Sequence, residues 1–357
     1  MAEGWVYLAP RGLECQNEPA SRLGPSRPGP ATAPPALVRL EVGRPAAAGT
    51  ARLRLSERRP MTGFLLCCGV ILGIMANRVE WPRPMAERID LTDLAARIPD
   101  GCSLGLPPDY SLVSMAAVRE LVRRKARGLH LIAAPVAGFA ADLLIGAGAV
   151  DSIEAAAASL GEFGAAPRFT AALRRGTLRM KDATCPAIHA GLQAAEKGVP
   201  FLPLRGLIGS DLLKVRPEWR VVDNPFGNDD PIVLLPALIP DVAVFHARWA
   251  DASGNLWIGR QRELATLAHA ARRSLVTVEE VVDDLFADEV RAAGALPALY
   301  VEAYAVAPGG AKPLGLPECY PRDDAELQAY AEAAATEEGF ARYLERFVWG
   351  EEVRRRA

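Results

Sequence analysis

The chain has 357 residues, of which 50% are hydrophobic and 24% charged, with a formal net charge of −2 at pH 7. This composition is ordinary for a globular protein, and it gives no reason to expect a nucleic-acid partner because the sequence has no basic stripe with interleaved aromatics. The six cysteines form no CxxC pair and no regular framework, which predicts reduced thiols in a cytoplasmic protein.

The N-terminal part, residues 1–84, differs from the rest of the chain. Segment 19–45 is mostly Pro, Ala, Gly and Arg, a composition that cannot bury enough apolar surface to fold. The apolar run 64–76 is shorter than the roughly 20 residues that a membrane-spanning helix needs. A signal peptide starting at Met61 would have no positively charged start and a weak cleavage site. We therefore expect a disordered or mis-annotated extension ahead of Met85, with a genuine targeting segment as the alternative.

From Met85 onward, short apolar strands alternate with helices. A helix is predicted over 91–98, ended by Pro99-Asp100-Gly101, and a strand over 102–106 follows. Further helices are predicted over 112–125, 140–145, 167–175, 186–197, 262–273, 324–334 and 338–349, and further strands over 129–134, 150–155, 178–181 and 275–279 and near residues 201, 232, 241 and 255.

Strands separated by helices of this length imply parallel pairing with right-handed crossovers. Gly254 marks a local antiparallel hairpin. The predicted fold class is therefore α/β, an open and mainly parallel sheet with flanking helices. We expect one domain over 85–350, followed by a basic tail over 351–357.

The segment Thr184-Cys-Pro-Ala-Ile-His189 begins one of these helices. Pro186 suits a first helical turn, which places Thr184 or Cys185 at the cap. A thiol at the positive end of a helix is favoured as thiolate, and His189 lies four residues on, on the same face. The pattern allows a nucleophilic Cys–His pair, a pocket-lining role without covalent chemistry, or only a cap and a packed histidine.

A second segment, Gly209-Ser210-Asp211, follows the apolar strand near residue 201. Consecutive backbone amides in such a turn make a concavity that binds a carboxylate or phosphate. Alternatively, Asp211 caps the element that follows. Further on, Asp251 and Asn255 are expected to form a turn, with a direct substrate role as the less favoured alternative.

His246 ends the apolar run that starts at residue 241, where a parallel strand would present it at the ligand edge of the sheet. It is either functional there or a structural histidine. Glu279 and Glu280 alternate faces on their strand, so only one can point into a cleft. That one could attack a thioester to give a mixed anhydride, or both could initiate the next helix. The four histidines show no metal-ligand spacing, and no metal is expected.

The order of these motifs over 88–348 resembles the alpha subunit of family I coenzyme A-transferases of the glutaconate type. The resemblance rests on Ile98-Pro-Asp-Gly101, Gly191-Leu-Gln-Ala-Ala195, Pro203-Leu-Arg-Gly206, Gly209-Ser-Asp211, Asp251-Ala-Ser-Gly-Asn255 and Val276-Thr-Val-Glu-Glu280. It implies a NagB/RpiA-like sheet and an alpha–beta heterodimer. It further implies that the nucleophile toward the acyl-CoA thioester is a glutamate of the beta subunit, while the alpha subunit lines the cleft.

The chain departs from the family in two places. Pro107-Pro108-Asp109 stands where the family tends to have Gly-Gly-Phe, and prolines remove the amide donors that an oxyanion contact needs. Related steroid-ring-opening CoA hydrolases carry a glutamate where this chain has Cys185, and a thiol cannot replace its acid/base chemistry at neutral pH. The alternatives to a transferase subunit are a non-catalytic acyl-CoA-binding partner and a CoA-thioester hydrolase or ring-opening subunit.

Two sets of candidate site residues follow from the motifs and the resemblance together. Cys185 and His246 are the candidate catalytic residues, and Gly209, Ser210, Asp211 and His189 are the candidates for binding substrate or CoA. The expected substrates are an acyl-CoA and a carboxylic acid, with the coenzyme A thioester as substrate and no cofactor. The expected partner is a beta-type subunit in a hetero-oligomer, with no nucleic acid and no membrane.

Overall fold

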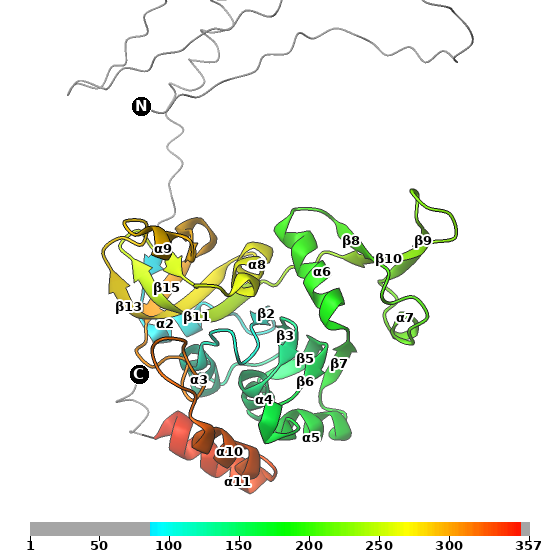
Figure 1. The fold of residues 1–357 in the computed structure, drawn as a ribbon. Coiled ribbons are helices and arrows are strands. Elements are labelled where there is room, and N and C mark those ends of the chain that lie inside the picture. The colour runs from blue at the N-terminus through cyan, green and yellow to red at the C-terminus, as the bar shows by residue number, and fades with distance from the viewer. Residues whose placement is uncertain (1–85, 351–357) are drawn as a thin grey trace, which may run out of the picture. The chain divides into compact units, whose positions relative to one another are not determined.

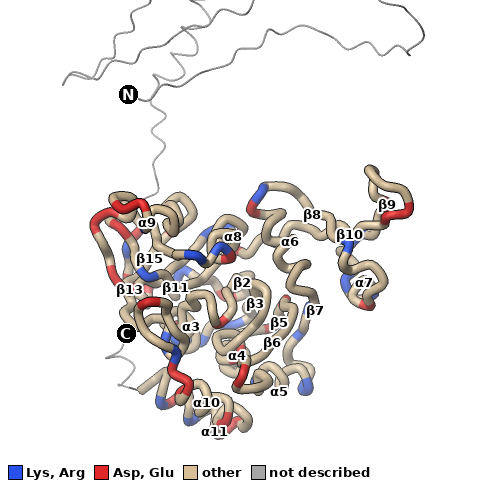
Figure 2. The backbone as a smooth tube through the Cα atoms, in the orientation of Figure 1, with Lys and Arg blue, Asp and Glu red and all other residues tan. Residues whose placement is uncertain are grey.

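The computed structural model describes residues 86–350 (Figure 1). The predicted extension 1–84 and the predicted tail 351–357 lie outside the described residues. Basic and acidic side chains are interspersed along the described backbone (Figure 2). No helix within 86–350 combines the length and the apolar character needed to cross a membrane.

A twisted sheet of parallel strands forms the centre of the described part (Figure 1). Its strand order is β1-β15-β13-β11-β2-β3-β5-β7, and every neighbouring pair in this order is parallel. The bounds are β1 Glu87–Arg88, β2 Ser103–Leu106, β3 Leu129–Ala133, β5 Val150–Ala155, β7 Arg179–Asp182, β11 Val242–Asp251, β13 Ser274–Val282 and β15 Ala303–Val306. The predicted fold class, an open and mainly parallel α/β sheet, is confirmed.

Helices cover both faces of this sheet because its strands are apolar on both faces. Val244 of β11 packs in a cluster with α3, α4, α10 and α11, whereas the next residue, Phe245, packs with α6 and α8. The helices are α2 Leu91–Ala96, α3 Met115–Arg123, α4 Phe139–Gly146, α5 Pro167–Arg175, α6 Cys185–Glu196, α7 Leu212–Val215, α8 Arg262–Ala270, α9 Glu289–Ala292, α10 Asp324–Ala333 and α11 Glu337–Leu344, with short turns η1 Gly161–Phe163, η2 Ala298–Tyr300 and η3 Glu345–Trp349.

The predicted hairpin at Gly254 is present. β11 turns into the short strand β12 (Leu256–Trp257), which pairs with it antiparallel, and β14 (Ala295–Leu296) pairs with β12. Gly254 adopts a left-handed conformation with φ +82°, which favours glycine. Asp251 accepts the amides of Ser253 and Asn255 at 2.9 and 3.0 Å, so it builds the turn as expected.

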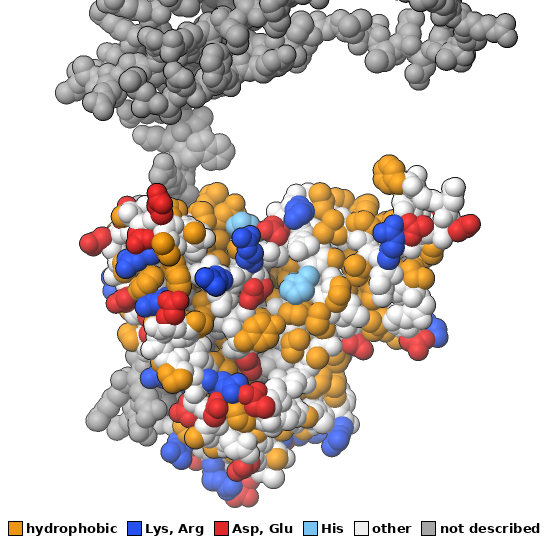
Figure 3. Space-filling model, in the orientation of Figure 1, with side chains coloured by type: hydrophobic (Ala, Val, Ile, Leu, Met, Phe, Trp, Pro, Cys, Tyr) orange, Lys and Arg blue, Asp and Glu red, His pale blue; other side chains and the backbone are white. Residues whose placement is uncertain are grey.

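The strands near residues 201 and 232 do not join the central sheet, and the parallel pairing expected for them is wrong. β8 (Phe201–Leu204), β10 (Pro231–Pro236) and β9 (Arg220–Asp223) form a separate antiparallel sheet in the order β8-β10-β9. Pro203 lies in the edge strand β8, where a missing amide donor is tolerated. All four residues of β9 are exposed, and Figure 3 shows hydrophobic side chains on the surface of this region. A two-stranded sheet, β4 (Val136–Ala137) with β6 (Ala157–Ala158), completes the strands.

Candidate active site

The loops that follow the parallel strands gather at one edge of the central sheet. β2 ends at Leu106, β3 at Ala133 and β15 at Val306, whereas the central strands β11 and β13 continue beyond that level. Just past the end of β2, the amide of His246 in β11 donates to the carbonyl of Leu112 at 2.6 Å. Side chains of β11 and β13 at this level therefore face the loops, which is where open α/β sheets bind ligands.

His246 and Glu279 are the centre of a hydrogen-bonded cluster at this edge. The Nδ1 atom of His246 lies 2.8 Å from Thr277 Oγ1, and its Nε2 atom lies 2.8 Å from Glu279 Oε1. Thr277 and Glu279 are two residues apart in β13, so they lie on the same face. The Tyr320 hydroxyl donates to Glu279 Oε1 at 2.7 Å, and the Gly309 amide donates to Oε2 at 2.8 Å. Both carboxylate oxygens are thus engaged.

These contacts fix the ionisation of the cluster. Burial favours a raised pKa for Glu279, but the hydrogen bonds from His246, Gly309 and Tyr320 outweigh it, and the pKa lies below its ordinary value. For Tyr320, burial and the bond to Glu279 act together and raise the pKa of the hydroxyl far above its ordinary value. The cluster at neutral pH therefore contains an ionised carboxylate and a protonated phenol.

His246 is held on every side by the protein. Its side chain is fully buried, whereas 15% of the Glu279 side chain is exposed. Because a carboxylate only accepts, a neutral His246 ring carries its proton on Nε2. Behind the ring, Ser114 Oγ lies 2.6 Å from Thr277 Oγ1, and a Cβ on Gly310 would lie 2.8 Å from the ring. This geometry suits a positioning role for His246, while Glu279 is the group that solvent reaches.

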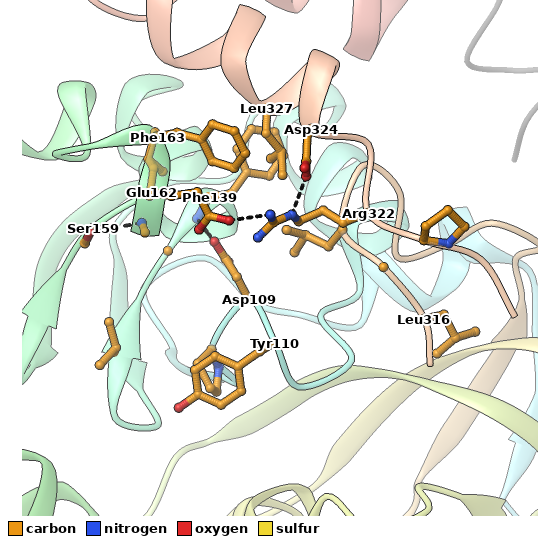
Figure 4. A pocket seen from close by; sticks show the side chains of 18 of the residues that line it. Asp109, Tyr110, Phe139, Ser159, Glu162, Phe163, Leu316, Arg322, Asp324 and Leu327 are labelled. Carbon is orange, nitrogen blue, oxygen red and sulfur yellow. Dashed lines mark hydrogen bonds and ion pairs between the residues drawn. The ribbon is translucent and has the colours of Figure 1, made fainter. Parts of the chain in front are cut away.

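A cavity of about 740 Å³ opens beside the cluster, with Tyr320 in its wall (Figure 4). This volume is in the range of roughly 300–1,000 Å³ found for small-molecule sites. The wall is formed by the loops after β2, β3 and β5, by the segment 314–324 and by the start of α10. Its apolar side chains include Val136, Phe139, Leu160, Phe163, Leu314, Leu316 and Leu327, and its charged ones are Asp109, Glu162, Arg322 and Asp324.

Asp109 fills the N-terminus of α4 with its own carboxylate. Its two oxygens accept the Phe139 amide at 2.8 and 3.1 Å, and a Cβ on Gly138 would lie 2.3 Å from the carboxylate. Burial is the largest influence on the pKa of Asp109 and, with the charge of Asp142, raises it to about 6 despite the bond from Phe139. Asp109 therefore occupies the amide donor that this helix start would otherwise offer to a ligand.

The sequence of the chain is similar to those of known transferase subunits, although it matches no protein-family model. It is 32% identical over 274 residues to the A subunit of 3-oxoadipate CoA-transferase from Pseudomonas knackmussii, covering 74% of this chain and 95% of the relative. It is also 30% identical to the A subunit of glutaconate CoA-transferase from Acidaminococcus fermentans, covering 66% and 78%. The chain belongs to the CoA-transferase family. This confirms the predicted family and the predicted alpha type of its subunit.

Solved structures of the CoA-transferase fold agree with this assignment. Glutaconate coenzyme A-transferase from Acidaminococcus fermentans matches with a TM-score of 0.67 and 27% identity, covering 74% of this chain and 89% of that chain. The decarboxylase AibA/AibB, as its C56S variant, matches with a TM-score of 0.64 and 32% identity, covering 73% and 99%. The cholesterol ring-cleaving hydrolase IpdA subunit of Mycobacterium tuberculosis is 28% identical, covering 75% and 94%.

In this CoA-transferase subunit, Cys185 and His189 both lie on α6. Thr184 caps the helix, since its side chain accepts a backbone amide of the first turn. Cys185 is exposed and lies near Tyr110 of the cavity wall, where burial, then Glu263 and Cys185, raise the pKa of the Tyr110 hydroxyl. No hydrogen bond joins Cys185 to His189 within the described residues. A nucleophilic role for the thiol stays a prediction.

Gly209, Ser210 and Asp211 lie in the loop between β8 and α7, in the part of the chain that carries the small antiparallel sheet. Gly209 has φ +79°, and the Ser210 amide donates to a carbonyl within the turn at 3.0 Å. The Asp211 side chain is 91% exposed and pairs with Lys214 at 2.6 Å. Among the described residues, no hydrogen bond or ion pair links this loop or α6 to His246. Binding of CoA or substrate by the loop stays a prediction.

Sequence reasoning did not identify Tyr320 and Arg322, and it noted Asp109 only as a departure from the family pattern. Tyr320 lies between α10 and the end of β15, in a stretch without hydrophobic periodicity. Its contact with Glu279 spans 41 residues of sequence. A pattern that reports neighbours three or four residues apart carries no signal for such a contact.

Proposed function

We propose that this subunit is one half of an acyl-CoA:carboxylate CoA-transferase whose nucleophilic glutamate comes from a beta-type partner. The observation that carries this proposal is the 32% identity across 95% of the 3-oxoadipate CoA-transferase relative, which is itself one of two kinds of subunit. The arrangement at the carboxyl edge of the central sheet supports it, because a cavity of suitable size lies there beside a buried polar cluster.

In the proposed reaction, the partner's carboxylate attacks the thioester carbonyl, the C–S bond breaks, and CoA leaves as thiolate from a mixed anhydride. The thiolate then attacks the glutamyl carbonyl and releases the first acid. The resulting glutamyl-CoA thioester passes CoA to a second carboxylic acid by the reverse steps. The only cofactor-like group needed is the CoA of the substrate, and this chain's share is to bind the acyl group and exclude water.

Glu279 has properties that fit a positioning carboxylate better than a nucleophile. Three hydrogen bonds hold its two oxygens, and its lowered pKa makes it a weaker nucleophile. The strand neighbour, Glu280, points to the other face and accepts the indole N–H of Trp249 at 2.5 Å. Both observations support a nucleophile on a second chain.

Co-expression with the beta-type protein encoded beside this chain tests the proposal. The complex should transfer CoA from an acyl-CoA donor to an added carboxylic acid, and this chain alone should not. Absence of a complex, or a complex that turns over none of a panel of acids, would contradict it. The free thiols Cys102, Cys185 and Cys319 fit a reducing compartment, so a cytoplasmic location is part of the proposal.

A hydrolase or ring-opening subunit is the second candidate, favoured by the 28% identity to the IpdA protein across 94% of its length. Product analysis separates the two activities. Hydrolysis gives free CoA without an acceptor acid, whereas transfer gives a new thioester in equal amount. Cys185→Ser in the complex tests whether the thiol takes part, since a nucleophile would lose its activity while a pocket-lining residue would retain most of it.

A further inference from the structure

Arg322 is the one basic side chain among the described residues that line the 740 Å³ cavity, and it is already paired. Its guanidinium donates to Glu162 and, at 2.6 Å, to Asp324 (Figure 4). Its guanidinium carbon lies 5.2 Å from the centre of the Phe163 ring. An arginine held by two carboxylates and one aromatic ring has little left to offer a third carboxylate.

The other charges in the cavity wall are negative. Asp109, Glu162 and Asp324 give three carboxyl groups against the single guanidinium. Each is bound within the protein: Asp109 to the Phe139 amide, and the other two to Arg322. A ligand therefore meets neither a free cation nor a carboxylate that lacks a partner in this wall.

The remaining surface of the wall is apolar. Phe139 and Leu160 come from the loops after β3 and β5, Leu314 and Leu316 from the segment after β15, and Leu327 from α10. Burying apolar ligand surface against these side chains is favourable, whereas an added carboxylate would lose its water and meet acidic neighbours.

We propose that this cavity binds the acyl group of the CoA thioester and selects one whose far end is uncharged and apolar. The inference rests on the proposed function. It sets the chain apart from the relatives named for 3-oxoadipate and glutaconate, which are both dicarboxylates. The acid that this subunit serves would then be a monocarboxylic acid with a hydrocarbon chain or ring.

Hexanoyl-CoA and adipyl-CoA test the inference, because they share a six-carbon acyl chain and differ in a terminal carboxylate. Binding of each to the full chain, alone and in complex with its partner, is measured by titration calorimetry. We expect hexanoyl-CoA to bind at least about tenfold more tightly, the effect of one unfavourable charge contact at a partly exposed site. Equal or tighter binding of adipyl-CoA, or no binding of either, would overturn the inference.

Glu162→Gln and Asp324→Asn sharpen this test, since each frees one side of Arg322. Both variants should bind adipyl-CoA about tenfold more tightly than the wild type and leave hexanoyl-CoA within about twofold. Glu338→Gln is the matched control, because Glu338 is exposed and pairs with Arg342 on α11. An adipyl-CoA affinity unchanged in both test variants would contradict the role of Arg322.

Binding and turnover separate this inference from the proposed function. A complex that binds hexanoyl-CoA preferentially but transfers CoA to no acid would support the acyl site and contradict the transferase reaction. Efficient transfer from adipyl-CoA, with no advantage for hexanoyl-CoA in kcat/KM, would support the reaction and overturn the inference.

Discussion

The edge of the central sheet and the small antiparallel sheet present the same kinds of polar residue in different settings. At the edge, His246 is fully buried and Glu279 accepts three hydrogen bonds. In the loop after β8, Asp211 is 91% exposed and pairs only with its near neighbour Lys214 among the described residues. A turn rich in Gly, Ser and Asp after an apolar strand therefore marks a ligand edge only where neighbouring parallel strands end beside it.

This difference has an energetic consequence. Removing one partner from a buried polar network leaves the others unsatisfied, whereas removing an exposed charge returns its neighbour to water. Four substitutions test the contrast, in order of decreasing expected effect.

Glu279→Ala should have the largest effect. It leaves His246, the Gly309 amide and Tyr320 without their acceptor, so the free energy of unfolding should fall by about 2–4 kcal/mol. Urea unfolding measures this. Glu280→Ala is the matched control on the opposite face and should cost less than about 1 kcal/mol. Equal costs for the two variants would show that the cluster does not stabilise the edge.

Asp109→Asn should change the pH dependence of stability. The pKa of Asp109 is raised from 3.8 to about 6 in the folded state, so between these values the folded protein keeps a proton that the unfolded chain has lost. Stability contributed by this group therefore falls as pH rises through that window, by about 1–3 kcal/mol. The variant should lack this fall and should be the more stable form above about pH 6. Parallel urea midpoints for both proteins from about pH 4.5 to 7 would refute this.

Tyr320→Phe should have a smaller effect. The variant keeps the ring but loses the hydroxyl that donates to Glu279 and accepts the Ala311 amide at 3.2 Å. We expect a loss of about 1 kcal/mol in unfolding free energy. Tyr300→Phe is the control, since Tyr300 stacks with its ring on His269 at 3.7 Å. The comparison fails if both variants unfold at the same urea concentration as the wild type.

Asp211→Ala should have the smallest effect, below about 0.5 kcal/mol, because the ion pair with Lys214 is exposed and screened by solvent. The variant also tests the predicted anion-binding role of the loop. If the Michaelis constant for the CoA thioester rises tenfold or more without loss of stability, the loop binds substrate in the complex, and the contrast between the two regions would have to be redrawn.

The sequence predicts the parallel sheet because each strand lies between helices of sufficient length, and it predicts the hairpin because Gly254 suits a tight turn. It also places His246 at the ligand edge, since the apolar run before it is typical of a buried strand. It does not predict the small sheet, because pairing of β8 with β10 depends on contacts across 29 residues or more. For the same reason it does not bring Tyr320 to Glu279 or Arg322 to Glu162.

Intact-mass spectrometry of the purified two-subunit complex, mixed with an acyl-CoA and no acceptor acid, tests the central claim most directly. If the covalent step belongs to the partner, the mass of CoA should appear on the beta-type protein, and this chain should keep its own mass. An adduct on this chain, or release of free CoA with neither protein modified, would contradict the account.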